Sequence, residues 1–417
     1  MIEILTSEVF QRVVKSKGEI TELNVKDFCK DGENFVAVLK EISFQFKDSD
    51  TNVESNHNVV LKYPNKDGFF YASITMFRGF EKEAKVYSDF LPDVKEWQKV
   101  IFGDIRYELP FPKCLYNDTK ECLFIMENLK TRGFNIDESL FDGLSNEQCK
   151  SVMKQLAIFH ALGYGYINSF KMKSEFDEKY EYLKGTTRET FDQLMNAIGS
   201  KDQMLSMFDA FTHVLKTKYP MEKEILGKMH KRLVEDSSHE YIYNFFTESN
   251  DFNVICHGDL WGNNILFSKV QNDGIHSMFV DLQGVKYCNP AVDLVHFFWV
   301  SASENVLCNH MEDLIYLYFT TFENILKDCK CNISFLFNDL RESVRRLHIS
   351  GFWRYVMQAV STFGKDANVM DASNDSNEKE TDTFYKKSIE IIKHANDELL
   401  NHCMIRIKFG NSLGIFA

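Results

Sequence analysis

The stretch "HGDLWGNN", residues 257–264, places a histidine, an aspartate and two asparagines in one short loop. The apolar runs "NVIC" and "ILF" stand directly before and after it, and each has the length of a strand. Aspartate and asparagine are common turn residues, so a loop of this composition is by itself most often only a turn. The segments on either side decide whether it carries chemistry.

A hairpin is predicted directly after this loop. The segment "NDG" at 272–274 is a strong turn signal between the apolar runs "ILF" and "MFVDLQ". A turn centred on 272–273 puts Asn264 opposite Asp281, and centring it one residue later moves the pairing by only two positions. Either way Asn264 and Asp281 meet at one end of the hairpin, with Asp259 just before it.

Two carboxylates and one amide at a single place suggest magnesium and phosphate chemistry. Hard oxygen ligands suit Mg²⁺, which fills its other positions with phosphate oxygens and water. A carboxylate that the metal does not consume can orient a hydroxyl and accept its proton. H-x-D, an asparagine five residues after that aspartate, and a hairpin that ends in aspartate is the arrangement of kinase catalytic loops.

The front of the chain is rich in predicted strands. "FVAVLKEISFQF" at 35–46 and "NVVLKYP" at 58–64 predict a hairpin, and "ECLFIMENL" at 121–129 predicts a further buried strand. Between them, apolar residues at three- and four-residue steps predict a helix over roughly 73–91. From about residue 143 onward the periodicity is mostly helical.

This order predicts an α+β protein with two unequal lobes. We expect a smaller N-terminal lobe over 1–127 and a larger helical lobe over 128–417, within one unit.

Lys62 and Glu83 form a predicted pair in the front lobe. Lys62 ends the strand "NVVLK", where an ammonium group can reach phosphates, although most strand-end lysines are ordinary surface residues. Glu83 falls inside the apolar arc of its helix, between Phe80 and Tyr87. A carboxylate on a buried face needs a cation, and Lys62 is the candidate.

The bulk composition narrows the class of partner and the compartment. The 417-residue chain is 44% hydrophobic and 26% charged with a net charge of −13, so nucleic acid and anionic membrane surfaces are poor partners. The start "MIEILTSEVFQRVV" is unlike a signal peptide, and no apolar run is long enough to span a bilayer. We therefore expect a cytoplasmic protein whose ten scattered cysteines are free thiols, without a zinc site.

Several motifs together resemble one family. "ICHGDLWGNNILF" followed by "FVDLQGVKYCNPAVDLVHFF" is similar to the ecdysteroid kinase-like family, part of the CHK kinase-like group within the aminoglycoside and choline phosphotransferase class. "DGENFVAVL", "VVLKYP", "FEKEAKVY", "LFIMENLKTRGF" and "LAIFHALGY" resemble further family segments in the expected order. The resemblance implies a bilobal protein-kinase-like fold that uses ATP and Mg²⁺.

The resemblance also implies roles in the catalytic segment. Asp259 matches the catalytic aspartate, and Asn264 and Asp281 match the metal ligands. His257 and Asp293 match residues that support the loop, and we treat both as structural. Trp261 is expected to pack, and His160 to be a satisfied helix histidine.

Nucleotide contacts follow by the same comparison. Lys62, paired with Glu83, matches the lysine that binds the α- and β-phosphates. The segment with Gly32, Asn34 and Phe35 is placed over the nucleotide by resemblance alone, since its single glycine is equally typical of a turn. Three residues would form the hinge that binds adenine through backbone groups: Glu127, Asn128 and Leu129. The chain departs from the family in having Asn128 where an aspartate is usual and Leu282 where a phenylalanine is usual.

These residues predict an ATP- and Mg²⁺-dependent kinase that phosphorylates a hydroxyl of a small molecule. The resemblance implies an ecdysteroid or related steroid, with hydroxylated xenobiotics and hence detoxification as the rival class. Aromatic residues over 203–247 either line an apolar pocket or form core. The alternative is a pseudokinase or ligand-binding module. It is disfavoured because the four residues that such proteins commonly lose in part are all present: Lys62, Asp259, Asn264 and Asp281. A protein kinase ranks lower, because no Ala-Pro-Glu segment follows Asp281. The sequence does not set the oligomeric state.

Overall fold

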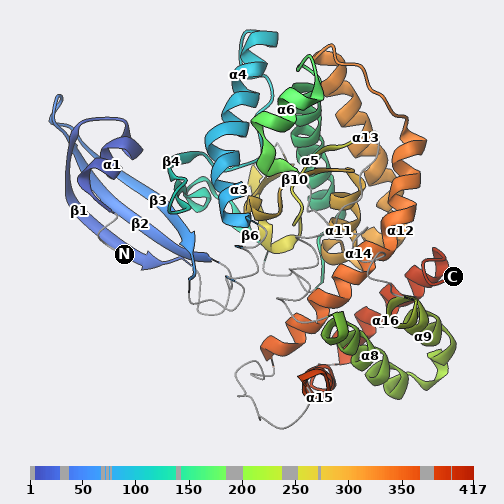
Figure 1. Ribbon diagram of the computed structural model, residues 1–417. Helices are drawn as coiled ribbons and strands as arrows, with labels where there is room; N and C mark the ends of the chain where they lie inside the picture. Colours follow the sequence, from blue (N-terminus) through green and yellow to red (C-terminus); the bar gives the residue numbers. More distant parts are fainter. Residues whose placement is uncertain are drawn as a thin grey trace.

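The computed structural model describes residues 5–28, 37–66, 71, 75, 78–137, 142–184, 201–236, 252–270, 274–366, 380–395 and 397–417. A sheet-rich part that contains the N-terminus stands beside a larger helical body that contains the C-terminus (Figure 1). The predicted α+β architecture with two unequal lobes is confirmed. The predicted boundary between the lobes, after residue 127, stays a prediction.

The N-terminal sheet is antiparallel, with its strands in the order β1-β2-β3-β5-β4. β2 and β3 form the predicted hairpin, with Leu39 opposite Lys62. Lys62 also pairs with Phe124 of β5, so it lies on a central strand and not at an edge. The five strands are β1 (Gly18–Asp27), β2 (Ala37–Asp48), β3 (Glu54–Pro64), β4 (Cys114–Asp118) and β5 (Leu123–Glu127).

One face of this sheet is covered by α1 (Ser7–Val14). Along β2 every second side chain, Ile42, Phe44 and Phe46, is buried, which is the period of a strand with one covered face. Phe10 of α1 packs edge-on against Phe44, with 4.6 Å between ring centroids. This small core specifies the register of the strands and so the position of Lys62 along β3.

The long helix beside the sheet consists of α3 (Gly79–Lys85), one wider π turn (Val86–Phe90) and α4 (Leu91–Phe102) in direct succession. The helix predicted over 73–91 is confirmed in type, but it extends to residue 102. Pro92 cannot donate a backbone N–H, and the π turn before it accommodates the missing bond without ending the helix. Gly103, with φ of 85°, ends the helix in the left-handed conformation.

Helices build most of the second part of the chain. α5 runs through its interior, in contact with α13 on one side and with strands β7 and β9 on another. The helices are α5 (Asn146–Ile167), α6 (Lys173–Lys179), α8 (Lys201–Lys218), α9 (Lys223–His230), α11 (Ala291–Ser301), α12 (Glu304–Asn309), α13 (Met311–Asp328), α14 (Phe337–Asp366), α15 (Glu380–Lys393) and α16 (Asp397–Ser412). Short helical turns span Leu129–Arg132, Glu181–Leu183, Pro220–Glu222 and Lys231–Glu235.

Two small sheets flank the polar loop at 257–264. β7 (Val254–Cys256) pairs with β10 (Lys286–Cys288), and β6 (Asn135–Ile136) pairs with β8 (Ile265–Val270), which pairs with β9 (Gly274–Phe279). The predicted hairpin is thus present, but Ile265 lies opposite Phe279, one position away from the expected register. Pairing extends to Val270 and Gly274, so three residues and not two separate the strands. Asn264 and Asp281 still meet at the same end.

The centre of the helical body is the contact between α11 and α14. α11 is buried on nearly all sides, as its apolar sequence "AVDLVHFFWVS" requires. A Cβ at Gly351 of α14 would come within 2.3 Å of the Trp299 side chain and 2.7 Å of the Val295 carbonyl oxygen of α11. Glycine at this position therefore lets the two helices approach closely.

The aromatic residues of α8 belong to this core. Phe208 and Phe211 are buried, and Phe208 packs against Trp353 of α14 with 5.4 Å between centroids. Within the described part of 203–247 these two side chains are core, whereas the segment "EYIYNFF" lies outside the described residues.

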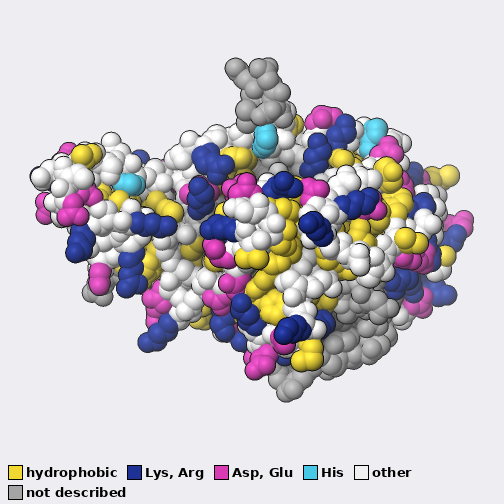
Figure 2. All heavy atoms as spheres, turned by 90° about the horizontal axis from the view of Figure 1, so that it is seen from above, with side chains coloured by type: hydrophobic (Ala, Val, Ile, Leu, Met, Phe, Trp, Pro, Cys, Tyr) yellow, Lys and Arg dark blue, Asp and Glu magenta, His cyan; other side chains and the backbone are white. Residues whose placement is uncertain are grey.

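On the surface, basic and acidic side chains are interspersed over the face in Figure 2, without a continuous basic area on that face. Among the helices that the structure describes, each is too short or too polar to cross a membrane.

Candidate active site

The polar loop is shaped by a close contact between two glycines. Gly258 has φ of 80°, and a Cβ there would lie 1.9 Å from the carbonyl oxygen of Gly284. Only glycine tolerates both the left-handed conformation and this approach. The contact presses the loop against the segment that follows Asp281, and so brings the two halves of the motif together.

Asp293, in the first turn of α11, binds the backbone of this loop. Its carboxylate accepts the backbone N–H of His257 at 2.6 Å and that of Gly258 at 2.9 Å. His160 of α5 contacts the same carboxylate at 3.2 Å and Tyr318 of α13 at 2.8 Å. Burial alone would raise the pKa of Asp293, but the contact with His160 and the backbone N–H groups hold it at about 2. Asp293 therefore stays ionised and fixes the loop backbone.

His257 links the loop to the hairpin. Its Nε2 lies 3.0 Å from the carbonyl oxygen of Val280, and its Nδ1 accepts the N–H of Asp259 at 3.3 Å. The ring therefore donates from Nε2 and accepts at Nδ1, which uses both nitrogens within the chain. These bonds support the loop, as expected for His257.

Asp259 and Asn264 contact one another directly. The amide nitrogen of Asn264 donates to the backbone oxygen of Asp259 at 2.9 Å and to its carboxylate at 3.0 Å. Burial and the nearby Asp281 carboxylate raise the pKa of Asp259, and a side-chain hydrogen bond from Trp261 opposes that rise.

A second polar group joins the sheet, the long helix and the hairpin. Lys62 Nζ lies 2.7 Å from the Glu83 carboxylate and 3.0 Å from the Asp281 carboxylate. Glu83 also accepts the N–H of Leu282 at 3.3 Å. Burial would lower the pKa of Lys62, but the two carboxylates outweigh it and raise it. The expected Lys62–Glu83 pair is present, and Lys62 and Glu83 are 4% and 0% exposed.

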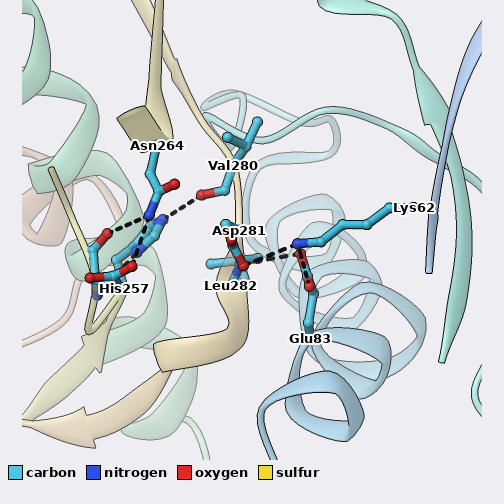
Figure 3. A network of polar contacts seen from close by, with 8 residues as sticks. Lys62, Glu83, His257, Asn264, Val280, Asp281 and Leu282 are labelled. Carbon is cyan, nitrogen blue, oxygen red and sulfur yellow. Dashed lines mark hydrogen bonds and ion pairs between the residues drawn. The ribbon is translucent and has the colours of Figure 1, made fainter. Parts of the chain in front are cut away.

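Asp281 connects the two groups. Figure 3 shows it between Asn264 and His257 on one side and the Lys62–Glu83 pair on the other. Its backbone is left-handed, with φ of 68°, a conformation that non-glycine residues rarely adopt. This conformation lets the carboxylate turn toward Lys62 where β9 ends. The structure therefore brings Lys62, Asp259, Asn264 and Asp281 to one place.

The donor set fits a magnesium ion. Asp259, Asn264 and Asp281 offer carboxylate and amide oxygens, the ligands that Mg²⁺ prefers. Because the amide nitrogen of Asn264 binds Asp259, its oxygen points away from that residue. Among the described residues, no hydrogen bond reaches this oxygen. It is therefore available to a metal.

The predicted hinge is a tight turn. The Asn128 side chain accepts the N–H of Lys130 at 3.0 Å and donates to Asn58 at 2.6 Å, and so caps the turn that begins at Leu129. Glu127 exchanges bonds with the backbone of Lys113: its N–H donates at 3.0 Å and its carboxylate accepts at 2.9 Å. The backbone N–H of Glu127 is thus occupied, and contact of this turn with adenine stays a prediction. The predicted residues Gly32, Asn34 and Phe35 lie outside the described residues.

Sequence reasoning missed Ser301 and Arg354, which both reach the loop. The Ser301 hydroxyl oxygen accepts the N–H of Gly262 at 2.9 Å. Arg354 of α14 donates to the carbonyl oxygen of Gly258 at 3.2 Å, across 96 positions of sequence. No local pattern marks it, because the packing of α14 on α11 creates this contact.

Comparisons with known proteins agree with the predicted family. The sequence matches the model of the ecdysteroid kinase-like family over residues 31–331. Among curated proteins, no relative matches at a significant level.

Two similar solved structures are remote. An ethanolamine kinase of Plasmodium vivax is 13% identical with a TM-score of 0.37, over 89% of this chain and 82% of that chain. The GDP and kanamycin complex of APH(2")-IIia is 11% identical with a TM-score of 0.34, over 93% of this chain and 96% of that chain. At these values neither likeness indicates a substrate.

The family match supports a phosphotransferase that acts on a small molecule, and it implies the use of ATP. Because the match spans well over half of the sequence, the chain belongs to the ecdysteroid kinase-like family.

Proposed function

We propose that this protein transfers a phosphoryl group from ATP, with Mg²⁺, to a hydroxyl group of a small molecule. One observation carries the proposal. Lys62, Asp259, Asn264 and Asp281 come from three separate parts of the chain and lie close together. Lys62 contacts Asp281 at 3.0 Å, and the Asn264 amide donates to Asp259 at 2.9 and 3.0 Å. The backbone N–H of Val280, the neighbour of Asp281, donates to the Asn264 carbonyl oxygen at 3.0 Å and joins the two pairs. A turn-forming loop without chemistry has no need of this convergence.

Asp259 is the proposed base. Burial and Asp281 raise the pKa of its carboxylate, which makes it a better proton acceptor than an exposed aspartate. Asn264 holds one carboxylate oxygen and thereby orients the other toward an incoming hydroxyl. Positioning of this kind supplies much of the rate enhancement in phosphoryl transfer.

Lys62 is the proposed phosphate-binding residue. Glu83 holds its ammonium group at 2.7 Å, which keeps the cation in place when Asp281 turns to other partners. Asn264 and Asp281 would hold Mg²⁺. When bound, this ion neutralises charge on the phosphates during transfer.

For the acceptor, we propose an apolar alcohol, an ecdysteroid or related steroid, with hydroxylated xenobiotics as the second class. Membership in the ecdysteroid kinase-like family supports this choice. A net charge of −13 disfavours nucleic acid as a partner. A cytoplasmic location is part of the same proposal.

The test is transfer of labelled phosphate from ATP into a panel of steroid, phenolic and glycoside alcohols. We expect transfer to one class, and loss of at least three orders of magnitude of activity in Asp259→Asn, because the amide cannot accept the proton. Asp313→Asn, an exposed aspartate in the first turn of α13, is the matched control.

Each outcome decides between the alternatives. Transfer that Asp259→Asn leaves intact would contradict the assignment of the base. ATP binding without transfer to any acceptor class would instead favour a pseudokinase or ligand-binding module.

A further inference from the structure

Arg354 connects the C-terminal helices to the proposed catalytic loop. It lies on α14, beyond residue 331, where the family match ends. Its Nη1 donates to the carbonyl oxygen of Gly258 at 3.2 Å and to Nδ1 of His296 at 3.0 Å. Since a guanidinium has only donors, His296 must accept, and it is neutral. Burial and the charge of Arg354 lower the pKa of His296 well below its usual range, in agreement with this.

The carbonyl of Gly258 belongs to the peptide group that leads directly into Asp259. A peptide group is planar, so its C=O and the N–H of Asp259 turn as one unit. Arg354 binds this unit at the oxygen, and His257 Nδ1 binds it at the nitrogen. The orientation of this plane sets the direction in which the Asp259 side chain leaves the backbone.

Gly258 makes such a restraint necessary. Glycine rotates more freely than any other residue, and here it has φ of 80°. Asp293 already fixes the preceding peptide group through the N–H of Gly258 at 2.9 Å. Among the residues that the structure describes, the following peptide group has one other hydrogen bond, the 3.3 Å bond to His257. The two peptide groups around Gly258 thus depend on α11 and α14 respectively.

Helix packing places the guanidinium. Asp293 and His296 lie three residues apart on one face of α11; Asp293 binds the loop, and His296 binds Arg354. Gly351, one turn before Arg354, allows α14 to approach α11 within the distance at which a Cβ would overlap Trp299. A wider spacing between the helices would withdraw Arg354 from the loop.

We propose that Arg354 is a positioning residue for phosphoryl transfer, which orients Asp259 by holding the Gly258 carbonyl. This inference rests on the proposed function for its catalytic consequence, but the restraint on the loop can be measured without any activity.

The experiment is amide hydrogen exchange of the loop peptide over 255–262 in the full chain, with ATP hydrolysis by water as the measure of turnover. In R354M we expect exchange in this peptide at least tenfold faster and turnover at least tenfold lower, with KM for ATP within twofold of the wild type. R354K, which keeps a cation but not the planar fork, should recover part of both. The matched control is R345M, since Arg345 is an exposed arginine of α14 whose one ion pair within the described ranges is with Glu342.

Unchanged loop exchange in R354M would overturn the proposal. If R354M loses protection throughout the protein, R354K decides: loss confined to 255–262 supports the proposal, and loss of equal size in α5 contradicts it. A wild type without turnover counts against the proposed function, while the exchange of the loop still decides the role of Arg354.

Discussion

Glu83 and Asp293 are both carboxylates without exposed surface, yet their pKa values shift in opposite directions. Burial raises the pKa of Glu83, and the Asp281 carboxylate adds to the rise, although Lys62 opposes it. For Asp293 the effect of burial is outweighed by His160 and by backbone N–H groups, and the pKa falls to about 2. Burial is the same in both, so the partners make the difference.

The difference matches what each region is proposed to do. The shortest contact of Glu83 is with the side chain of Lys62, at 2.7 Å, whereas its backbone partner, the N–H of Leu282, lies at 3.3 Å. Lys62 in turn divides its contacts between Glu83 and Asp281. Such a group can rearrange when a phosphate and a metal enter. Two of the partners of Asp293 are backbone N–H groups, which cannot move without moving the loop. We therefore expect the contacts around Glu83 to change when ligands bind, and those around Asp293 to stay the same.

The largest expected effect is that of Asp293→Asn. The carboxylate accepts two backbone N–H groups, and the NH₂ of an asparagine would face one of them, donor against donor. We therefore expect a loss of about 4 kcal/mol in the free energy of unfolding. Urea unfolding measures it, and Asp313→Asn should stay within about 0.5 kcal/mol of the wild type. A loss below about 1 kcal/mol would mean that the loop is held elsewhere.

Lys62→Met should lower the free energy of unfolding by about 3 kcal/mol, because Glu83 is left buried without its cation. Unlike the loss in Asp293→Asn, this one should be compensated by a second substitution: Lys62→Met combined with Glu83→Leu should regain most of the stability. ATP binding should be lost in both variants. If the double variant is as unstable as the single one, the contrast between side-chain and backbone partners is wrong.

Lys82, next to Glu83, is a third kind of buried charge. It is 8% exposed, and among the described residues no carboxylate forms an ion pair with it. Burial, together with the cations Lys286 and Arg78, lowers its pKa to about 8. Between about pH 8 and 10.5 the unfolded chain then binds more protons than the folded one, so stability rises with pH in this window.

We therefore expect Lys82→Met to stabilise the protein by about 2 kcal/mol at pH 7 and to flatten this rise. Thermal unfolding at pH 7, 8, 9 and 10 would measure both effects. Lys85→Met, on the same helix and partly exposed, should cost at most about 1 kcal/mol. Destabilisation by Lys82→Met would show that the ammonium has a stabilising partner.

The smallest expected effect is a loss of stability at acidic pH through protonation of Asp293. The pKa of Asp293 is lower in the folded protein than in the unfolded chain, so its contribution is complete above about pH 4 and is lost as pH falls toward 2. The difference in unfolding free energy between the wild type and Asp293→Asn should shrink by about 1 kcal/mol from pH 5 to pH 3. A constant difference over this range would contradict the lowered pKa.

The two regions also differ in how far the sequence predicted them. Asn264 and Asp281 were placed together because turn chemistry and strand period act over a few residues, and a one-position change of register left them at the same end. Helical periodicity placed Glu83 on the buried face of its helix, and the need of a buried carboxylate for a cation pointed to Lys62. Local rules suffice where the contacts follow from the geometry of one hairpin or one helix face.

Around Asp293 the same rules failed in part. His160 is the satisfied helix histidine that the sequence predicts, but its partner Tyr318, 158 positions away, was not predicted. Arg354 was not predicted at all, because its contact depends on the spacing of α11 and α14 at Gly351. Packing between helices that are distant in sequence leaves no periodic signal.

The central claim is that Lys62, Asn264 and Asp281 form a site for ATP with Mg²⁺. Calorimetric titration of the full chain with ATP, in the presence and absence of Mg²⁺, tests it most directly when Asp281→Asn is measured beside the wild type. We predict binding to the wild type that weakens at least tenfold without Mg²⁺, and loss of this Mg²⁺ dependence in Asp281→Asn. No binding of ATP to the wild type, or binding that neither Mg²⁺ nor the substitution changes, would contradict the claim.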